Sequence, residues 1–198
     1  MTSLVESLTD GADELRYVLT PGRLAWLHKP HSEYRTREGI DPRLRATIQE
    51  CVAGKADWPL VLWGDAGSGK TCAGLCMVDS FGGWAVDFPD LHDLVLKARA
   101  RLLFNSGGFV ETLDGRGGVW DTWEHASLTV LDEVGQRAPT NAMYDTLLRA
   151  MNLRRALPAV FISNLPPEEL VDVYDDRIVS RLKAGTVIGL AGDRRLKQ

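Results

Sequence analysis

Cysteine is scarce in this chain of 198 residues, and its three occurrences follow neither a disulfide nor a metal-binding pattern. Cys51, Cys72 and Cys76 show no paired C-x-x-C spacing, and no histidine lies close to them in the sequence. Cys72 and Cys76 stand four residues apart on one expected helix face, where a metal pair is the alternative interpretation. Buried, reduced thiols are the better interpretation of this spacing.

Long apolar runs and a basic excess are also missing. No run approaches the roughly 20 residues needed to cross a bilayer, so no membrane-spanning segment is predicted. The acidic start, M-T-S-L-V-E-S-L-T-D, lacks the basic region of a signal peptide, and a cytoplasmic protein is expected. The 23 Lys and Arg against 27 Asp and Glu give a net charge of −4, which argues against strong non-specific DNA binding but is compatible with local basic patches.

Short apolar strands alternate with helical segments from Trp58 onward. Strands are predicted at residues 59–64, 84–88, 127–133, 158–164 and 186–190. Helices are predicted at residues 42–53, 70–79, 89–103 and 140–156 and from Pro167, with a glycine-rich loop at 105–118. This alternation predicts a parallel sheet covered by helices on both faces. Ahead of it, residues 1–20 carry a helical apolar stripe and residues 28–41 resemble a polar linker.

The segment G-D-A-G-S-G-K-T lies between the first of these strands and the helix that follows. Its glycines allow a tight turn whose N–H groups point at phosphate, Lys70 reaches the β- and γ-phosphates, and the Thr71 hydroxyl coordinates Mg²⁺. A glycine turn in an unrelated fold is the alternative, but the strand-loop-helix context favours a P-loop. The predicted ATP-binding residues are Gly64, Asp65, Ala66, Gly67, Ser68, Gly69, Lys70, Thr71 and Cys72.

Two adjacent carboxylates, Asp132 and Glu133, end the apolar strand L-T-V-L-D-E. The carboxyl edge of a parallel sheet is where ligands bind, so Asp132 is placed to hold Mg²⁺ and Glu133 to act as general base on the attacking water. Solvated turn residues are the alternative for such a pair taken alone. A glutamate directly after the aspartate also argues against a small-molecule or nucleotide kinase, whose acceptor replaces water.

Two further patterns follow in the sequence. Asn164 ends the strand F-I-S-N, where it could bond the attacking water or the γ-phosphate, or merely begin the turn before Leu165-Pro166-Pro167. Arg177 and Arg181 lie one helical turn apart in D-D-R-I-V-S-R-L, either on a solvated helix face or as an arginine finger for a neighbouring subunit. Arg181 is favoured as the finger.

Together these segments resemble the AAA+ ATPases, and within them the DnaC-type helicase loaders and their IstB-like relatives. L-V-L-W-G-D-A-G-S-G-K-T is similar to their Walker A motif and L-T-V-L-D-E-V-G to their Walker B motif. A-V-F-I-S-N-L-P-P-E-E-L is similar to sensor 1, with Ile162 where the family usually has Thr. Y-D-D-R-I-V-S-R-L-K resembles box VII, and the terminal G-D-R-R resembles a sensor 2 segment with its arginine at Arg195.

The resemblance covers about residues 58–196 and implies an architecture and a function. It implies a five-stranded parallel sheet of order 5-1-4-3-2 in an AAA+ domain at 56–198, behind a small helical N-terminal region at 1–55 and without a C-terminal lid. It implies a Mg²⁺-dependent ATPase that assists DNA replication as a helicase loader, of phage or mobile-element origin. It further implies a homo-oligomer that binds ATP between subunits, single-stranded DNA and a replicative helicase.

Three other functions stay open at this point: an IstB-like transposition helper acting on duplex DNA, a P-loop kinase, and an ATP switch that does not hydrolyse. For DNA binding, the resemblance directs attention to Lys97, Arg99 and Arg101, ahead of the glycine-rich loop. A solvated basic helix end is the alternative there. The next candidates are Arg149, Arg154 and Arg155. The stripe at 1–20 is expected to pack on the ATPase domain or, preferably, on a partner.

Overall fold

A computed structural model describes residues 42–104, 119–135 and 139–193 of the chain. Its centre is a sheet of five parallel strands: β1 (Leu60–Gly64), β2 (Trp84–Asp87), β3 (Thr129–Val134), β4 (Ala159–Ser163) and β5 (Thr186–Leu190). The strand order β2-β3-β4-β1-β5 is the order implied by the family resemblance, which is thereby confirmed.

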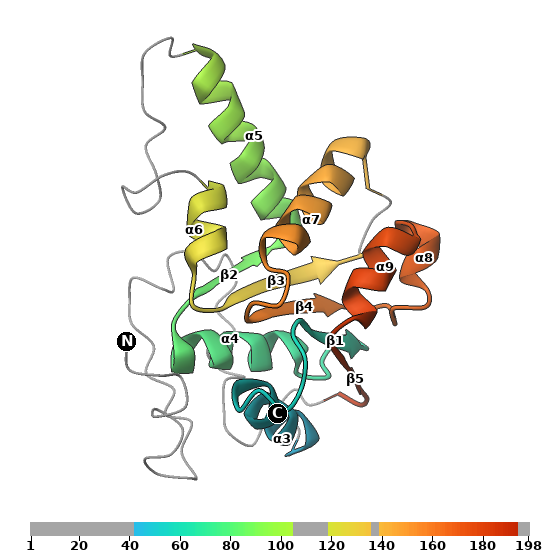
Figure 1. The fold of residues 1–198 in the computed structure, drawn as a ribbon. Helices are drawn as coiled ribbons and strands as arrows, with labels where there is room; N and C mark the ends of the chain where they lie inside the picture. Colours follow the sequence, from blue (N-terminus) through green and yellow to red (C-terminus); the bar gives the residue numbers. More distant parts are fainter. Residues whose placement is uncertain (1–41, 105–118, 136–138, 194–198) are drawn as a thin grey trace.

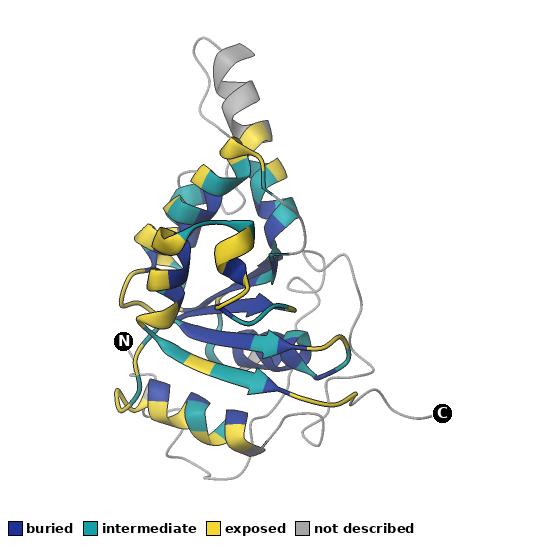
Figure 2. Cartoon of the chain, turned by 90° about the vertical axis from the view of Figure 1, so that its right-hand side faces the viewer, coloured by how far each residue is buried: buried dark blue, intermediate teal, exposed yellow. Residues whose placement is uncertain are grey.

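Helices cover both faces of this sheet (Figure 1). One face carries α3 (Pro42–Val52) and α4 (Lys70–Phe81). The other carries α5 (Phe88–Phe104), α6 (Val119–His125), α7 (Asn141–Leu153), α8 (Leu170–Val173) and α9 (Asp176–Lys183). Each face has its own cluster of buried apolar side chains, and most strand residues are buried (Figure 2). The sheet is therefore the middle of three layers.

Two helices differ from the prediction. Helix α6 was not expected, because V-W-D-T-W-E-H is too short for a helical period to be visible. The single helix expected from Pro167 is two helices, since α8 ends at Val173 and Asp175 starts α9 as its N-cap. The Asp175 carboxylate accepts hydrogen bonds from the N–H groups of Arg177 and Ile178. The Asp175 cap therefore begins a new helix where the sequence suggested one continuous helix.

Helix α3 packs with the sheet. Leu44 and Ile48 are fully buried in the same cluster as Leu60 and Leu62 of β1. The division expected between residues 55 and 56 stays a prediction about domains, but the packing assigns α3 to the core of the sheet. The stripe at residues 1–20 and the linker at 28–41 lie outside the described residues.

The pairing of β3 with β4 contains a bulge. Leu131 pairs with Phe161 and Val134 with Ser163, so β3 has one residue more than β4 over the same stretch. The irregularity lies at Asp132 and Glu133. Despite their spacing of three, Leu131 and Val134 both belong to the buried cluster on the α7 side, because the bulge offsets the normal alternation of side chains.

Candidate functional site: a phosphate loop beside two carboxylates

Three strands end together at the carboxyl edge of the sheet. Ser163 of β4 pairs with Trp63 of β1 on one side and with Val134 of β3 on the other. This register brings the loop after β1, the acids of β3 and Asn164 after β4 to one edge. Ligands of open parallel sheets bind at that edge.

The P-loop turns sharply between β1 and α4. Gly64 has a φ of 141°, and a Cβ there would collide with the carbonyl of Leu190 on β5. Gly67 and Gly69 also have positive φ, of 85° and 94°. Such angles favour glycine strongly, so these positions are set by backbone geometry. The helix α4 begins directly after this turn, at Lys70, which leaves its first N–H groups directed at the loop.

Lys70 lies inside the loop, with only 6% of its surface exposed. Its ammonium donates hydrogen bonds to the carbonyls of Gly64 (2.7 Å) and Asp65 (2.8 Å) and to the hydroxyl of Ser68 (3.3 Å). Burial lowers the pKa of this lysine, while the charges of Asp132 and Asp65 act to raise it. The loop thus holds a cation at its centre, as phosphate binding requires.

Thr71 and Asp132 lie side by side although 61 residues separate them in the sequence. The Thr71 hydroxyl donates a hydrogen bond of 2.5 Å to Oδ2 of Asp132. Burial raises the pKa of Asp132, opposed by the hydrogen bonds from Thr71 and from the N–H of Glu133. A half-buried carboxylate beside a hydroxyl is a pair of hard oxygen ligands, so the two residues fit Mg²⁺.

Glu133 occupies the bulge itself. Its φ is 63°, an angle that residues other than glycine adopt only at a cost, and its N–H donates a 2.7 Å hydrogen bond to Oδ1 of Asp132. The side chain is partly exposed to solvent. The sequence placed both acids at the strand end correctly, but nothing in it indicated that a bulge would turn Glu133 out of the regular ladder. Bulges beside active sites commonly redirect a side chain in this way.

Asn164 is exposed directly after β4. The turn that follows is closed by its neighbour, since the Ser163 hydroxyl accepts a hydrogen bond from the N–H of Leu165 at 3.0 Å. Ser163 thus makes the turn contact that was the alternative explanation for Asn164. Asn164 lies at the same edge of the sheet as the P-loop and the acids of β3. A contact of Asn164 with the phosphates or the attacking water stays a prediction.

Arg177 and Arg181 both lie on α9. Arg181 is partly buried, and its guanidinium donates to Oδ1 of Asn152 on α7 and to the carbonyl of Arg177, both at 2.9 Å. Arg177 is exposed. The hydrogen bonds of Arg181 therefore attach it to α7 and to its own helix.

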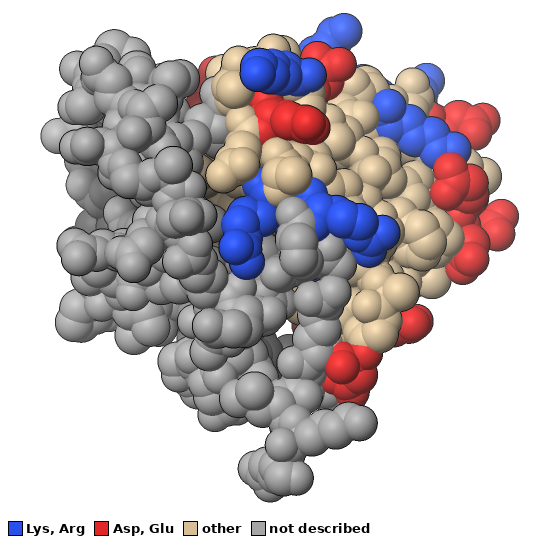
Figure 3. Space-filling view, turned by 90° about the horizontal axis from the view of Figure 1, so that it is seen from below, with Lys and Arg blue, Asp and Glu red and all other residues tan. Residues whose placement is uncertain are grey.

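Other predicted residues fall into two groups. Cys51, Cys72 and Cys76 are buried free thiols, as expected, and Cys72 contributes its side chain to the core beside α3. Its part in binding ATP would therefore come from its main chain. Arg195 and the side chains of Lys97, Arg99 and Arg101 lie outside the described residues. On the face seen from below, basic and acidic side chains are interspersed among the described residues (Figure 3).

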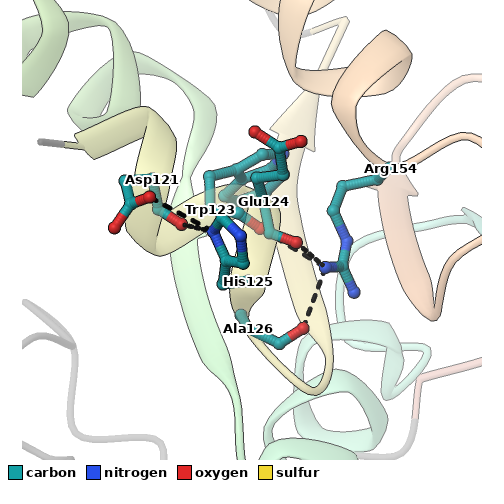
Figure 4. A network of polar contacts seen from close by, with 6 residues as sticks. All are labelled: Asp121, Trp123, Glu124, His125, Ala126 and Arg154. Carbon is teal, nitrogen blue, oxygen red and sulfur yellow. Dashed lines mark hydrogen bonds and ion pairs between the residues drawn. The ribbon is translucent and has the colours of Figure 1, made fainter. Parts of the chain in front are cut away.

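Arg154 cannot contact DNA, contrary to its place among the candidates. It is 2% exposed, and its guanidinium donates to the carbonyls of Glu124 and Ala126 (2.8 Å each) and Trp123 (3.4 Å) (Figure 4). It also donates to the carbonyl of Pro158 (2.5 Å). Burial lowers its pKa to about 10, so it remains a cation at neutral pH. Its charge lies at the C-terminal end of α6, where a helix favours a cation.

No helix in the described part of the chain is long and apolar enough to cross a membrane. Within the same residues, no group of three or more His, Cys, Asp and Glu side chains forms a metal cluster.

The fold is similar to that of several solved proteins of DNA replication. DnaI is 19% identical, with a TM-score of 0.60 over 83% of this chain and 95% of that one. A DnaC helicase loader is 16% identical, with a TM-score of 0.53 over 74% and 89%. The replication initiator DnaA, solved with AMPPCP and single-stranded DNA, is 18% identical, with a TM-score of 0.60 over 82% of this chain.

The chain spans about half the length of the replication initiators that it matches, 49% for that DnaA. No protein-family model matches the sequence, and no curated protein matches it significantly. Identities below 20% establish a shared fold rather than shared activities. The chain has the fold of an AAA+ P-loop NTPase, like the replication proteins to which it is similar.

Proposed function

We propose that this protein is a Mg²⁺-dependent ATPase that assists DNA replication as a helicase loader. The observation that carries the proposal is the meeting of the P-loop with the two carboxylates of β3, in which Thr71 bonds Asp132 and Glu133 stands next to it in a bulge. The likeness of the fold to DnaI and to a DnaC helicase loader supports the replication role.

Each residue of the site then has a distinct task. Lys70 exchanges its bonds to the loop carbonyls for bonds to the β- and γ-phosphates. Thr71 and Asp132 would hold Mg²⁺, which would neutralise charge on the phosphates. Glu133 accepts the proton of the attacking water, and Asn164 orients that water. A general base beside Asp132 favours hydrolysis over transfer to a second substrate, so an ATPase fits better than a kinase.

A second subunit completes the site in this proposal. AAA+ sites of this kind would take an arginine from the neighbouring protomer, worth about 10³–10⁵ in turnover where such fingers are known. Arg181, favoured from the sequence, is attached to Asn152 in its own subunit, whereas Arg177 is exposed. We therefore assign the finger to Arg177. The homo-oligomer would surround single-stranded DNA, which DnaA binds in its solved complex, and present residues 1–41 to a replicative helicase.

Two substitutions test the assignment of the site. We expect Lys70→Ala to abolish ATP binding, because the loop loses its central cation. We expect Glu133→Gln to bind ATP normally and to lose hydrolysis, because the amide cannot accept the proton. Glu169→Gln, which alters an exposed glutamate outside the site, is the matched control. Normal turnover in Glu133→Gln would place the base elsewhere.

The replication role needs its own measurement. The intact chain should bind a replicative helicase and place it on closed circular single-stranded DNA when ATP is present. Lys70→Ala should fail in this assay while it remains folded. If instead the protein ignores helicase and binds duplex DNA with a transposase, the transposition helper would be the correct function.

A further inference from the structure

Gly135, two residues after Glu133, is hydrogen-bonded to Tyr174, which lies 39 residues further along the chain. The N–H of Gly135 donates a hydrogen bond of 3.1 Å to the hydroxyl of Tyr174. Gly135 has a φ of 91°, and a Cβ at this position would collide with Cδ2 of Leu170. The chain therefore leaves β3 pressed against α8, in a conformation that requires glycine and directs its N–H at one phenol.

Tyr174 is itself firmly held. It follows α8 directly, its N–H donates to the carbonyl of Leu170 at 2.9 Å, and Leu170 is completely buried. Burial raises the pKa of the Tyr174 phenol to about 12, so the hydroxyl is neutral at physiological pH. A neutral phenol accepts the Gly135 hydrogen bond and can donate one as well. Tyr174 therefore offers the Gly135 N–H an acceptor whose position is fixed by α8 and its buried Leu170.

The residue after Tyr174 belongs to the helix that carries the two arginines. Asp175 caps α9, and its Oδ2 accepts a 2.6 Å hydrogen bond from the hydroxyl of Tyr144 on α7. Ile178, Val179 and Leu182 bury the other side of α9 in the core. Asp175 and α9, which follow Tyr174 directly, are therefore held to α7 by a hydrogen bond and to the sheet by packing.

Glu133 lies only two residues before the anchored glycine. Its backbone has a positive φ in the bulge, between the paired residues Leu131 and Val134. The Glu133 N–H bond to Asp132 restrains the chain before the carboxylate, and the pairing of Val134 with Ser163 restrains it after. The Gly135 N–H bond to Tyr174 is the next restraint, at the point where the strand ends, so its loss would loosen the chain on the carboxyl side of Glu133.

We propose that Tyr174 is a positioning residue for ATP hydrolysis, which holds the Glu133 turn in its catalytic position through the N–H of Gly135. The inference rests on the proposed function, since it assumes that Glu133 is the general base. Tyr174 acts on the base of its own subunit, whereas Arg177 of α9, as the proposed finger, acts on the site of the next subunit.

The test is Tyr174→Phe, which keeps the ring and removes only the hydroxyl. We expect kcat to fall about tenfold, within the hundredfold that a misplacement of about 1 Å can cause, while the affinity for ATP is unchanged. A purely structural role would instead lower the melting temperature and ATP binding together. The amide hydrogen of Gly135 should exchange faster with solvent in this variant than in the wild type, which shows independently that the bond has been lost.

Arg177→Ala is the comparison, because it alters an exposed side chain of α9 that is proposed to act on the next subunit and leaves the Tyr174 contacts in place. Each variant is mixed with Lys70→Ala, which supplies normal arginines to a neighbour but binds no ATP. The defect of Arg177→Ala should be rescued by this mixing. The defect of Tyr174→Phe should persist, because its altered Glu133 stays in the site that hydrolyses ATP.

An unchanged kcat in Tyr174→Phe would overturn the inference, and so would rescue by Lys70→Ala. These results differ from failure of the proposed function. If Glu133→Gln retained turnover, the general base itself would be wrong, whatever Tyr174 does. If Glu133→Gln is inactive and Tyr174→Phe is fully active, the ATPase assignment stands and only the positioning role falls.

Discussion

At the scale of single residues, Glu133 shows a conflict between stability and its proposed role as general base. A residue with a Cβ at a φ of 63° is strained, and such strain costs on the order of 1 kcal/mol or more. In return for this strain, the bulge leaves the side chain of Glu133 next to Asp132 and partly open to water. Strained residues of this kind concentrate at functional sites.

Glu133→Gly should therefore stabilise the protein while abolishing hydrolysis. Glycine adopts the positive φ without strain, and we expect a gain of about 0.5–1 kcal/mol in the free energy of unfolding after allowing for its greater freedom in the unfolded chain. Chemical denaturation measures the change. Glu133→Gln keeps the Cβ and serves as control, and it should leave stability nearly unchanged. Equal stability of the glycine and glutamine variants would contradict the prediction.

The residues of the P-loop and β3 were predictable for a physical reason. The sequence places Lys70, Thr71 and Asp132 correctly at one sheet edge, because a P-loop is visible in its local spacing and the acids follow an apolar strand. The contacts of Tyr174 and Arg181 were not predictable, because each partner lies on a different element: Gly135 is 39 residues away and Asn152 is 29. Only the packing of α7, α8 and α9 brings them together.

At the scale of secondary-structure elements, α6 depends on one buried cation. Its carbonyls at Trp123 and Glu124, and that of Ala126 just beyond, all accept hydrogen bonds from Arg154. The indole N–H of Trp123 in turn donates to the carbonyl of Ala150 on α7 at 3.0 Å. A helix of seven residues has little stability of its own, so these contacts with α7 and Arg154 stabilise it.

Replacement of Arg154 should cost far more than replacement of its neighbour. Arg154→Met leaves several carbonyls without donors, and we expect a loss of about 3–5 kcal/mol in the free energy of unfolding. Arg154→Lys should also destabilise, because an ammonium cannot reproduce the planar fork. The exposed Arg155→Met should change stability by no more than about 0.5 kcal/mol. Urea titrations compare the three variants, and similar midpoints for all would refute the structural role of Arg154.

Element order was easier to predict than element ends. Five apolar segments in an alternating pattern indicated the sheet, and each strand lies within two residues of its expected bounds. The helix expected at 140–156 ends at Leu153 because Arg154 turns into the core. Because arginine is usually exposed, the sequence suggested that Arg154 faces solvent and DNA. In the structure, its partners are main-chain carbonyls.

At the scale of the whole molecule, α3 determines where the protein can be shortened. Leu44 and Ile48 are buried against β1 and α4, and each is worth about 1.5–3 kcal/mol of burial. The sum is a large part of the 5–15 kcal/mol that stabilises a typical domain. A boundary drawn at residues 55 and 56 would remove both side chains.

Two truncated proteins test this directly. A chain beginning at Ile40 keeps α3 and should fold and bind ATP, but should lose helicase binding if residues 1–20 form the docking segment. A chain beginning at Ala56 should unfold at much lower denaturant concentration or aggregate. Circular dichroism and nucleotide binding give the comparison. Equal stability of the two would mean that α3 is dispensable, and helicase loading by the chain beginning at Ile40 would place the docking surface in the ATPase domain.

The bulge in β3 has a consequence for how activity can be lost. If a single codon were deleted at Glu133, then Leu131, Asp132 and Val134 would match Phe161, Ile162 and Ser163 one to one. The apolar side chains of Leu131 and Val134 would keep the face that they already occupy, because alternation would become regular. Glu133 is thus not needed for the pairing of the sheet, and under the proposed function one in-frame deletion would turn a hydrolysing protein into a folded one that only binds its nucleotide.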